Sequence, residues 1–235
     1  MSTFFQFVIE GLTTGSFYAL VALGYTMVYG IIRLINFAHG DLFMVGAFVG
    51  WTGLTVLAAA HIPLALALLI ALVAAMAVTG ALGLAIERLA YQPLLRAPRL
   101  SILITALGVS LALENGVLLI YGAGFSTYPH VLSQAGLEFH DVQITFAQIG
   151  IIVTSFALML ALYFFVHGTF IGTAMRALAI DQDAARLMGI DVERLIQLTF
   201  FLGSALAAVA GVMEGIYYTQ INFFMGFVLG LRAFT

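Results

Sequence analysis

The chain of 235 residues is too apolar to form a soluble domain. Hydrophobic residues make up 63% of it and charged residues 8%, the mean hydropathy is +1.13, and the formal net charge is −3. A soluble domain carries about 25% charged residues, so this chain cannot cover itself with a solvated surface. The composition therefore predicts several membrane spans, and the small net charge gives no indication of a nucleic-acid partner.

Residue types that are absent from the sequence exclude several kinds of chemistry. All eight basic residues are arginine, and there is no cysteine. Without lysine there is no Gly-Lys-Ser/Thr phosphate loop and no Schiff base, and without cysteine there is no thiolate nucleophile. The apolar stretches also lack paired aspartates and a metal-ligand motif, so we expect no enzyme. We expect no cofactor in this chain, and any ATP must be bound and hydrolysed by another chain.

Six apolar stretches have about the 20 residues that a helix needs to cross the hydrocarbon core. Their runs are continuous rather than alternating, and Ala and Leu dominate them, which disfavours strands. We therefore predict an all-α bundle of about six or seven transmembrane helices, forming a single transmembrane domain over residues 1–235. The stretches are Gly11–Ile32, Leu42–Ala60, Ile62–Ile86, Ser101–Gly122, Ile144–Val166 and Leu195–Met213.

The segment Ile35–Asp41 lies between the first two apolar stretches and contains Asn, His, Gly and Asp. Asn36 and Asp41 offer side-chain oxygens for capping, and Gly40 tolerates a left-handed conformation. We expect one helix to end near Asn36 and the next to begin near Asp41. Two interpretations stay open: a short cytoplasmic turn with Arg33 and Asp41 among the lipid headgroups, or an unwound segment inside the bilayer that lines a solute path.

The second interpretation defines a candidate translocation path. His39 and Asp41 are too few for a metal site, and the chain has no His-Glu-x-x-His motif, so we expect His39 to act as a hydrogen-bonding residue. Glu114 and Glu214 lie within apolar stretches and should face protein or water, because a charge at mid-bilayer costs about 2.5 to 3.5 kcal/mol. The path residues are Tyr25, Asn36, Phe37, His39, Gly40 and Asp41.

The distribution of arginine predicts the orientation of the helices. By the positive-inside rule, loops rich in arginine are cytoplasmic. The loop Ala123–Gln143 has acidic residues and no arginine, so it and the N-terminus are expected outside. The arginines of the two predicted cytoplasmic loops are Arg88, Arg96 and Arg99 in the first, and Arg176, Arg186 and Arg194 in the second.

The loop Gly172–Asp191 has the start and stop signals of a short helix. Asp181 is a good N-cap, Gly189 suits the position after the last turn, and Asp191 can cap the sixth span. Two turns of helix are not stable alone, so this helix needs a partner surface. It either lies on the lipid interface or docks into a groove on another protein, and we favour docking. The predicted apolar stripe consists of Ala184, Ala185, Leu187 and Met188, with Arg186 exposed.

Several segments resemble the LivH-type branched-chain amino-acid permeases of bacterial ABC importers. The N-terminal half carries the resemblance in Gly15–Leu20, Ala22–Gly30 and Ile35–Asp41, whose sequence Ile-Asn-Phe-Ala-His-Gly is highly specific for this branch. Gly172–Asp191 and Ala207–Gly211 match in order and spacing. The resemblance implies further helices after Thr235, so we expect the C-terminal segment of the family to be missing from these 235 residues.

The resemblance implies a multi-pass permease of the bacterial inner membrane. Its implied partners are a second related permease, two ATP-binding subunits, a periplasmic binding protein and membrane lipid. The implied substrates are leucine, isoleucine and valine, moved by ATP-driven alternating access, with urea or short amides as the alternative. A proton-coupled carrier that uses Glu114 and Glu214 is a further alternative. The implied coupling residues are Arg176, Ala177, Asp181, Ala184, Ala185, Leu187 and Gly189.

Overall fold

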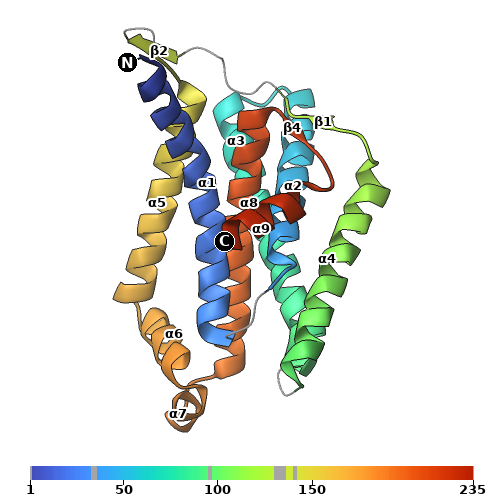
Figure 1. Cartoon of the computed structure of the whole chain (residues 1–235), viewed down its shortest axis with the longest axis vertical. Helices are drawn as coiled ribbons and strands as arrows, with labels where there is room; N and C mark the ends of the chain where they lie inside the picture. The colour runs from blue at the N-terminus through green and yellow to red at the C-terminus, as the bar shows by residue number, and fades with distance from the viewer. Residues whose placement is uncertain (1, 33–35, 95–96, 130–135, 140–141, 235) are drawn as a thin grey trace.

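Six long helices form a bundle in the computed structural model, which describes residues 2–32, 36–94, 97–129, 136–139 and 142–234 (Figure 1). Each of the six is long and apolar enough to cross a membrane. The prediction of an all-α transmembrane bundle is therefore confirmed. Arg33, Ile35, Arg96 and Asp141 lie outside the described residues. The helices are α1 (Ser2–Ile32), α2 (His39–Ala59), α3 (Leu64–Ile86), α4 (Arg99–Tyr121), α5 (Phe146–Gly168) and α8 (Val192–Tyr218).

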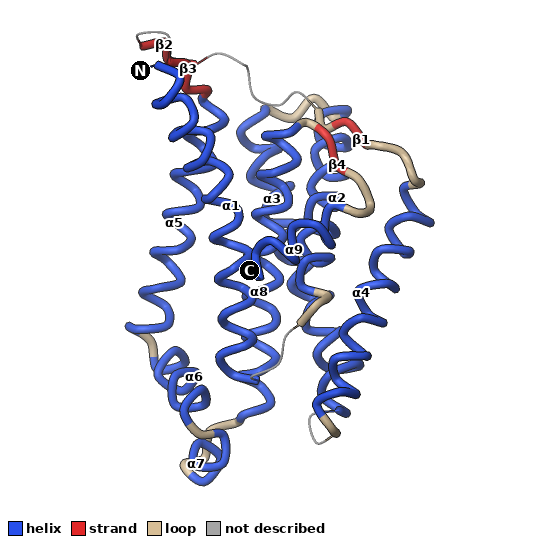
Figure 2. The backbone as a smooth tube through the Cα atoms, viewed as in Figure 1, coloured by secondary structure: helices blue, strands red, loops and turns tan. Residues whose placement is uncertain are grey.

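Shorter elements connect the spans. α3 continues into a π-helical turn, η1 (Glu87–Tyr91), and a 3₁₀ turn, η2 (Gln92–Leu94). Two antiparallel strand pairs, β1 (Ser126–Thr127) with β4 (Gln220–Ile221) and β2 (Gly136–Phe139) with β3 (Val142–Thr145), lie at the end of the bundle that holds the N-terminus (Figure 2). The remaining helices are α6 (Phe170–Ile180), α7 (Gln182–Leu187) and α9 (Met225–Phe234).

Helix α8 forms the centre of the bundle. In its most apolar stretch 72% of the residues are buried, against 11% in α5, whose outer surface is free to face lipid. Small residues let α2 and α8 approach closely, since a Cβ atom on Gly46 would clash with the backbone of Ala208. Close packing through small residues is the usual means by which helices associate in lipid. Gly46 therefore contributes to the close packing of α2 against α8.

The two ends of the bundle carry different segments. Figure 1 shows α6, α7 and the start of α8 at one end, and the N-terminus with the strand pairs at the other. Arg88, Arg176, Arg186 and Arg194 belong to the first end, and the acidic loop belongs to the second. This separation agrees with the predicted orientation, in which the arginine-bearing end is cytoplasmic.

Most helix boundaries lie a few residues from the predicted ones, and two of these differences have clear local reasons. α1 begins at Ser2 rather than Gly11, because Gln6 and Glu10 pair one turn apart, at 3.3 Å, and do not interrupt the helix. α5 begins at Phe146 rather than Ile144, because Thr145 and Gln148 form a capping box there. A capping box satisfies free amides of the first turn and so fixes where a helix starts.

Candidate translocation path and coupling helix

Helix α2 begins inside the bundle and not at its cytoplasmic end. The imidazole of His39 lies against Gly24 of α1, and Gly24 in turn faces Gly203 of α8. At 1.5 Å per residue, Gly24 is about 12 Å from Ile32 at the end of α1, and Gly203 is about 17 Å from the start of α8. Figure 2 shows the same offset between the end of α1 and the start of α2. Of the two interpretations of this break, the geometry favours the segment within the bundle.

Asn36 leads into α2 but does not cap it. Its Oδ1 atom accepts a hydrogen bond of 2.7 Å from the hydroxyl of Tyr91, and its backbone carbonyl accepts one of 3.1 Å from the amide of His39. The residue at the N-cap position is Ala38, which has no capping side chain. The predicted capping by Asn36 is therefore wrong, because the π-helical turn η1 brings Tyr91 to the same oxygen. π-helical turns often occur at functional sites.

The first turn of α2 buries two ionisable side chains. His39 and Asp41 are each 1% exposed. The His39 ring packs on Tyr25, with ring centroids 4.5 Å apart, and its Nε2 atom has no hydrogen-bond partner among the described residues. The carboxyl of Asp41 lies near the Ser110 hydroxyl of α4, but neither of its oxygens makes a hydrogen bond of good geometry among the described residues. Asp41 was predicted to cap α2, but it lies within the first turn instead.

Asp41 faces helix α4, which carries a further buried polar atom without a hydrogen-bond partner among the described residues. Ser110 and Glu114 of α4 lie on the side toward Asp41, and Oε1 of Glu114 is buried without a partner among the described residues. Burying a polar group without a hydrogen bond is costly, and a charged group costs more. Such groups in a native structure require an explanation, which in a transport protein is water or a passing solute.

Helix α9 covers the start of α2. Gly226 and Gly230, one turn apart on α9, contact Gly40, where a Cβ atom would lie 2.8 Å from the Cα atom of Gly230. A Cβ atom on Gly230 would in turn lie 3.2 Å from the Tyr25 hydroxyl. Gly40 was expected to supply a left-handed conformation, but it is part of helix α2. Its missing side chain instead permits the backbone of α9 to approach, as close contacts require.

The predicted path residues thus gather around one point. Tyr25, His39, Gly40 and Asp41 meet beneath α9, and Asn36 reaches Tyr91 on the cytoplasmic side of them. Phe37 is partly buried against the cytoplasmic half of the core. In the part of the chain that the structure describes, no three His, Asp or Glu side chains come together as a metal site.

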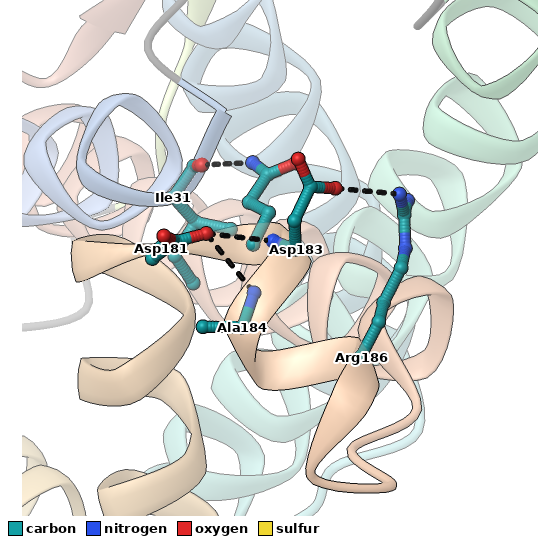
Figure 3. Close-up of polar contacts among 6 residues, drawn as sticks. Ile31, Asp181, Asp183, Ala184 and Arg186 are labelled. Atoms are coloured by element: carbon teal, nitrogen blue, oxygen red, sulfur yellow. Dashed lines mark hydrogen bonds and ion pairs between the residues drawn. The ribbon is translucent and has the colours of Figure 1, made fainter.

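At the cytoplasmic end, Asp181 separates two short helices. It ends α6, and its Oδ1 atom accepts hydrogen bonds from the amides of Asp183 (2.9 Å) and Ala184 (3.0 Å) at the start of α7 (Figure 3). Gly189, with φ of +80°, follows α7, and Asp191 caps α8 by accepting from the amide of Arg194. The predicted start and stop signals are confirmed. The predicted short helix is α7, and a further helix, α6, precedes it.

The predicted apolar stripe of α7 divides between two surfaces. Leu187 and Met188 are 89% and 82% exposed, so they project from the end of the bundle. Ala184 is also exposed, whereas Ala185 is 3% exposed and packs in the core of this chain. A bulky residue at position 185 would therefore disturb the fold itself, and it does not isolate a docking contact.

Two other predicted coupling residues lie on α6. Arg176 donates a hydrogen bond of 2.6 Å from Nη1 to the carbonyl oxygen of Val166, near the end of α5, and a second one to Thr173. Cations that bind the last carbonyls of a helix stabilise its C-terminus. Ala177 is partly buried. Both residues therefore contribute to the position of α6 below α5.

Sequence reasoning missed Gln182, the first residue of α7. Its Nε2 atom donates a hydrogen bond of 2.7 Å to the carbonyl oxygen of Ile31, in the last turn of α1 (Figure 3). The carbonyls of a last helical turn have no partner within the helix, so this bond satisfies one of them. It links the protruding helix directly to the span that precedes the break at residues 36–41. No local sequence pattern signals it, because the two residues are 151 positions apart.

These features define a multi-pass membrane protein with buried polar residues among its spans. Its sequence matches the family model described as branched-chain amino acid transport system / permease component over residues 7–235. The chain belongs to this family. Because the family is a component of a transport system, the protein functions within a multi-component transporter, as a multi-pass protein of the inner membrane.

Individual relatives agree with the family assignment. The chain is 42% identical to the high-affinity branched-chain amino acid transport system permease protein BraD of Pseudomonas aeruginosa and to LivH of Escherichia coli K12, in each case over 99% of this chain and 77% of the relative. It is 31% identical to the probable LivH of Methanocaldococcus jannaschii, over 82% of this chain and 60% of that protein. No solved structure matches the chain.

Proposed function

We propose that this chain is the membrane subunit through which an ATP-driven importer moves leucine, isoleucine and valine into the cell. The names of its relatives support the substrate class, since they are branched-chain amino acid permeases. In this proposal the chain pairs with a second, related permease and works with two ATP-binding subunits and a periplasmic binding protein. The chain holds no cofactor, and ATP is bound by the partner subunits.

The observation that carries the proposal is the exposed tip of α7. Leu187 and Met188 project from the end of the bundle, on a helix whose position is fixed by the Asp181 cap and by the bond from Gln182 to Ile31. Fully burying a leucine side chain is worth about 1.5–3 kcal/mol, so two such residues favour a partner that covers them. A groove on an ATP-binding subunit is the partner that we assign to them.

The buried polar residues at the start of α2 support a solute path. In the proposed cycle the pair of permeases alternates between outward-open and inward-open states, and Tyr25, His39 and Asp41 contact the solute or its water as it passes. Asn36, Phe37 and Gly40 shape the segment between them. Broken helices are tolerated at membrane depth where they line a cavity or are buried in protein, which is the situation at this break.

Copurification tests the coupling assignment. We expect Leu187→Asp to reduce recovery of the ATP-binding subunit with the permease by at least about tenfold, because the burial energy of Leu187 is lost. Arg194→Ala is the matched control: its exposed side chain lies at the same end and pairs only with Asp191 through an exposed ion pair, which contributes little. Equal recovery with Leu187→Asp and the control would contradict the assignment.

Uptake by the assembled importer tests the energy source and the substrate. Proteoliposomes that contain the permease pair, the ATP-binding subunits and the binding protein should accumulate radiolabelled leucine when ATP is supplied. Accumulation should stop without ATP and continue when the proton gradient is collapsed. Uptake that survives loss of ATP but stops with the proton gradient would instead indicate a proton-coupled carrier, and uptake of urea in place of leucine would indicate the other permease branch.

A further inference from the structure

A cavity of about 210 Å³ opens beside α9 in the outer half of the bundle. Its lining comes from α1, α8, α9 and the turn before α9, and the α9 residues that line it are other than Gly226 and Gly230, which contact Gly40. Glu214, on its wall, is about 6 Å along α8 from the outer end at Tyr218. The other lining residues are Tyr18, Asn222, Phe224, Met225, Val228, Leu229 and Arg232.

Opposite charges line this cavity. Arg232 donates a hydrogen bond of 3.3 Å to the hydroxyl of Tyr18, and Glu214 faces the same space from α8. Oε2 of Glu214 is buried and has no hydrogen-bond partner among the described residues. A guanidinium has five donors in a planar fork that suits a carboxylate. A carboxylate accepts readily from an ammonium group.

The rest of the lining is mixed. Phe224, Met225, Val228 and Leu229 provide aromatic and aliphatic surface next to the two charges, and Tyr18 and Asn222 add polar groups. Drug-sized ligands occupy roughly 300–1,000 Å³, so this cavity suits a smaller molecule. Polar groups beside apolar side chains suit a ligand that has both charged and apolar parts.

We infer that this cavity binds an apolar α-amino acid as its zwitterion, with the ammonium group on Glu214, the carboxylate on Arg232, and the side chain against α9. The inference rests on the proposed function, which it deepens by naming an entry site for the solute. α9 then separates this site from Tyr25, Gly40 and Asp41, because its glycine face contacts them. The solute reaches the centre of the bundle only when α9 moves.

Three probe molecules distinguish the contribution of Glu214 from that of Arg232. L-Leucine carries both head groups, 4-methylpentanoate lacks the ammonium, and 3-methylbutylamine lacks the carboxylate. The assembled permease and ATP-binding subunits, without the binding protein, are placed in nanodiscs, and the dissociation constant of each probe is measured by equilibrium dialysis. We expect Glu214→Gln to weaken leucine and the amine about tenfold and to leave 4-methylpentanoate within about twofold, since a charge-assisted hydrogen bond is lost.

Arg232→Gln should give the reverse pattern: weaker binding of leucine and 4-methylpentanoate, with the amine unchanged. A merely structural role would weaken all three probes alike, so equal losses in both variants would overturn the inference. Unchanged binding of leucine in both variants would overturn it as well. Equal recovery of the complex from all variants, checked by size-exclusion chromatography, shows that assembly is intact.

Uptake separates this inference from the proposed function. If the wild-type importer accumulates leucine with ATP while neither variant changes probe binding, the proposed function stands and the cavity is not the entry site. If the importer accumulates no leucine but the probes give the predicted pattern, the cavity binds amino-acid zwitterions and the assigned substrate is wrong.

Discussion

At the start of α2, polar side chains are buried among apolar helices, whereas at α7 apolar side chains project from the end of the bundle. His39 and Asp41 are each 1% exposed, and Leu187 and Met188 are 89% and 82% exposed. Each group is in the environment opposite to the one that its chemistry favours. Both regions therefore carry an energetic cost within this chain alone. In the proposed function something outside the chain removes that cost in each case: a solute or water at α2, and another protein at α7.

The two regions also differ in what fixes them. The start of α2 is fixed by contacts with α1, α8 and α9, so it moves only if whole helices move. α7 is fixed by local caps, by the packing of Ala185 in the core, and by the long-range hydrogen bond from Gln182 to Ile31. If a partner displaces α7, the displacement is therefore transmitted directly to α1. Through α1 it is transmitted to the break at residues 36–41. The three changes below test this difference, beginning with the largest expected effect.

The contact between α2 and α9 should be the most sensitive to substitution. In Gly40→Leu the new side chain would overlap the backbone of Gly226 and Gly230. We expect the free energy of unfolding to fall by about 3 kcal/mol, since overpacking at a rigid contact costs about that much. Thermal unfolding of the purified protein measures the change. Gly108→Leu on α4 is the control, because no atom lies within 4 Å of a Cβ there, and a similar loss in both variants would contradict the assigned contact.

Replacing Asp41 should separate stability from transport. Neither carboxyl oxygen of Asp41 makes a hydrogen bond of good geometry among the described residues, so Asp41→Leu should raise the free energy of unfolding by about 2 kcal/mol. The same variant should abolish leucine uptake, because the solute loses a polar contact on its path. Thermal unfolding and uptake are measured on one preparation.

Thr79→Val supplies the matched control for Asp41. Thr79 is also fully buried, and its hydroxyl has no partner among the described residues, but it lies on α3 away from the break. The variant should be stabilised while uptake continues. If Asp41→Leu retains full uptake, Asp41 is not part of the path. If Asp41→Leu instead lowers the free energy of unfolding, the Asp41 carboxyl has hydrogen-bond partners in the folded protein.

Local signals in the sequence predicted one region well. Asp181, Gly189 and Asp191 act as caps within three residues of the groups that they bind, so their positions follow from short-range preferences. The same pattern misplaced Ala185, because a helix of six residues has too few turns for periodicity to separate an inner face from an outer one. Sequence therefore located α7 but not the surface it presents.

The other region needed the structure. The residue types at 36–41 indicated a break, yet they were equally consistent with a turn at the membrane surface. The contact of His39 with Gly24 sets the depth of the break within the bundle. Gly226 and Gly230, which are nearly 200 positions further along the chain, cover the break. The hydrogen bond between Asn36 and Tyr91 likewise depends on a π-helical turn that no composition rule predicts. Long-range packing decides these features.

Gln182 offers the finest test of how the two regions are connected. In Gln182→Ala the hydrogen bond to the carbonyl oxygen of Ile31 is lost, which costs about 1 kcal/mol and leaves α7 with its cap and its exposed apolar tip. We therefore expect the ATP-binding subunit to copurify as before and to hydrolyse ATP, while leucine uptake per ATP hydrolysed falls about fivefold. The ratio of uptake to hydrolysis in proteoliposomes measures this coupling. Arg186→Ala is the control on the same helix, since its exposed ion pair with Asp183, at 3.6 Å, contributes little. An unchanged ratio in Gln182→Ala would mean that the movement of α7 reaches the break by another route, through α6 and α8 rather than through the end of α1.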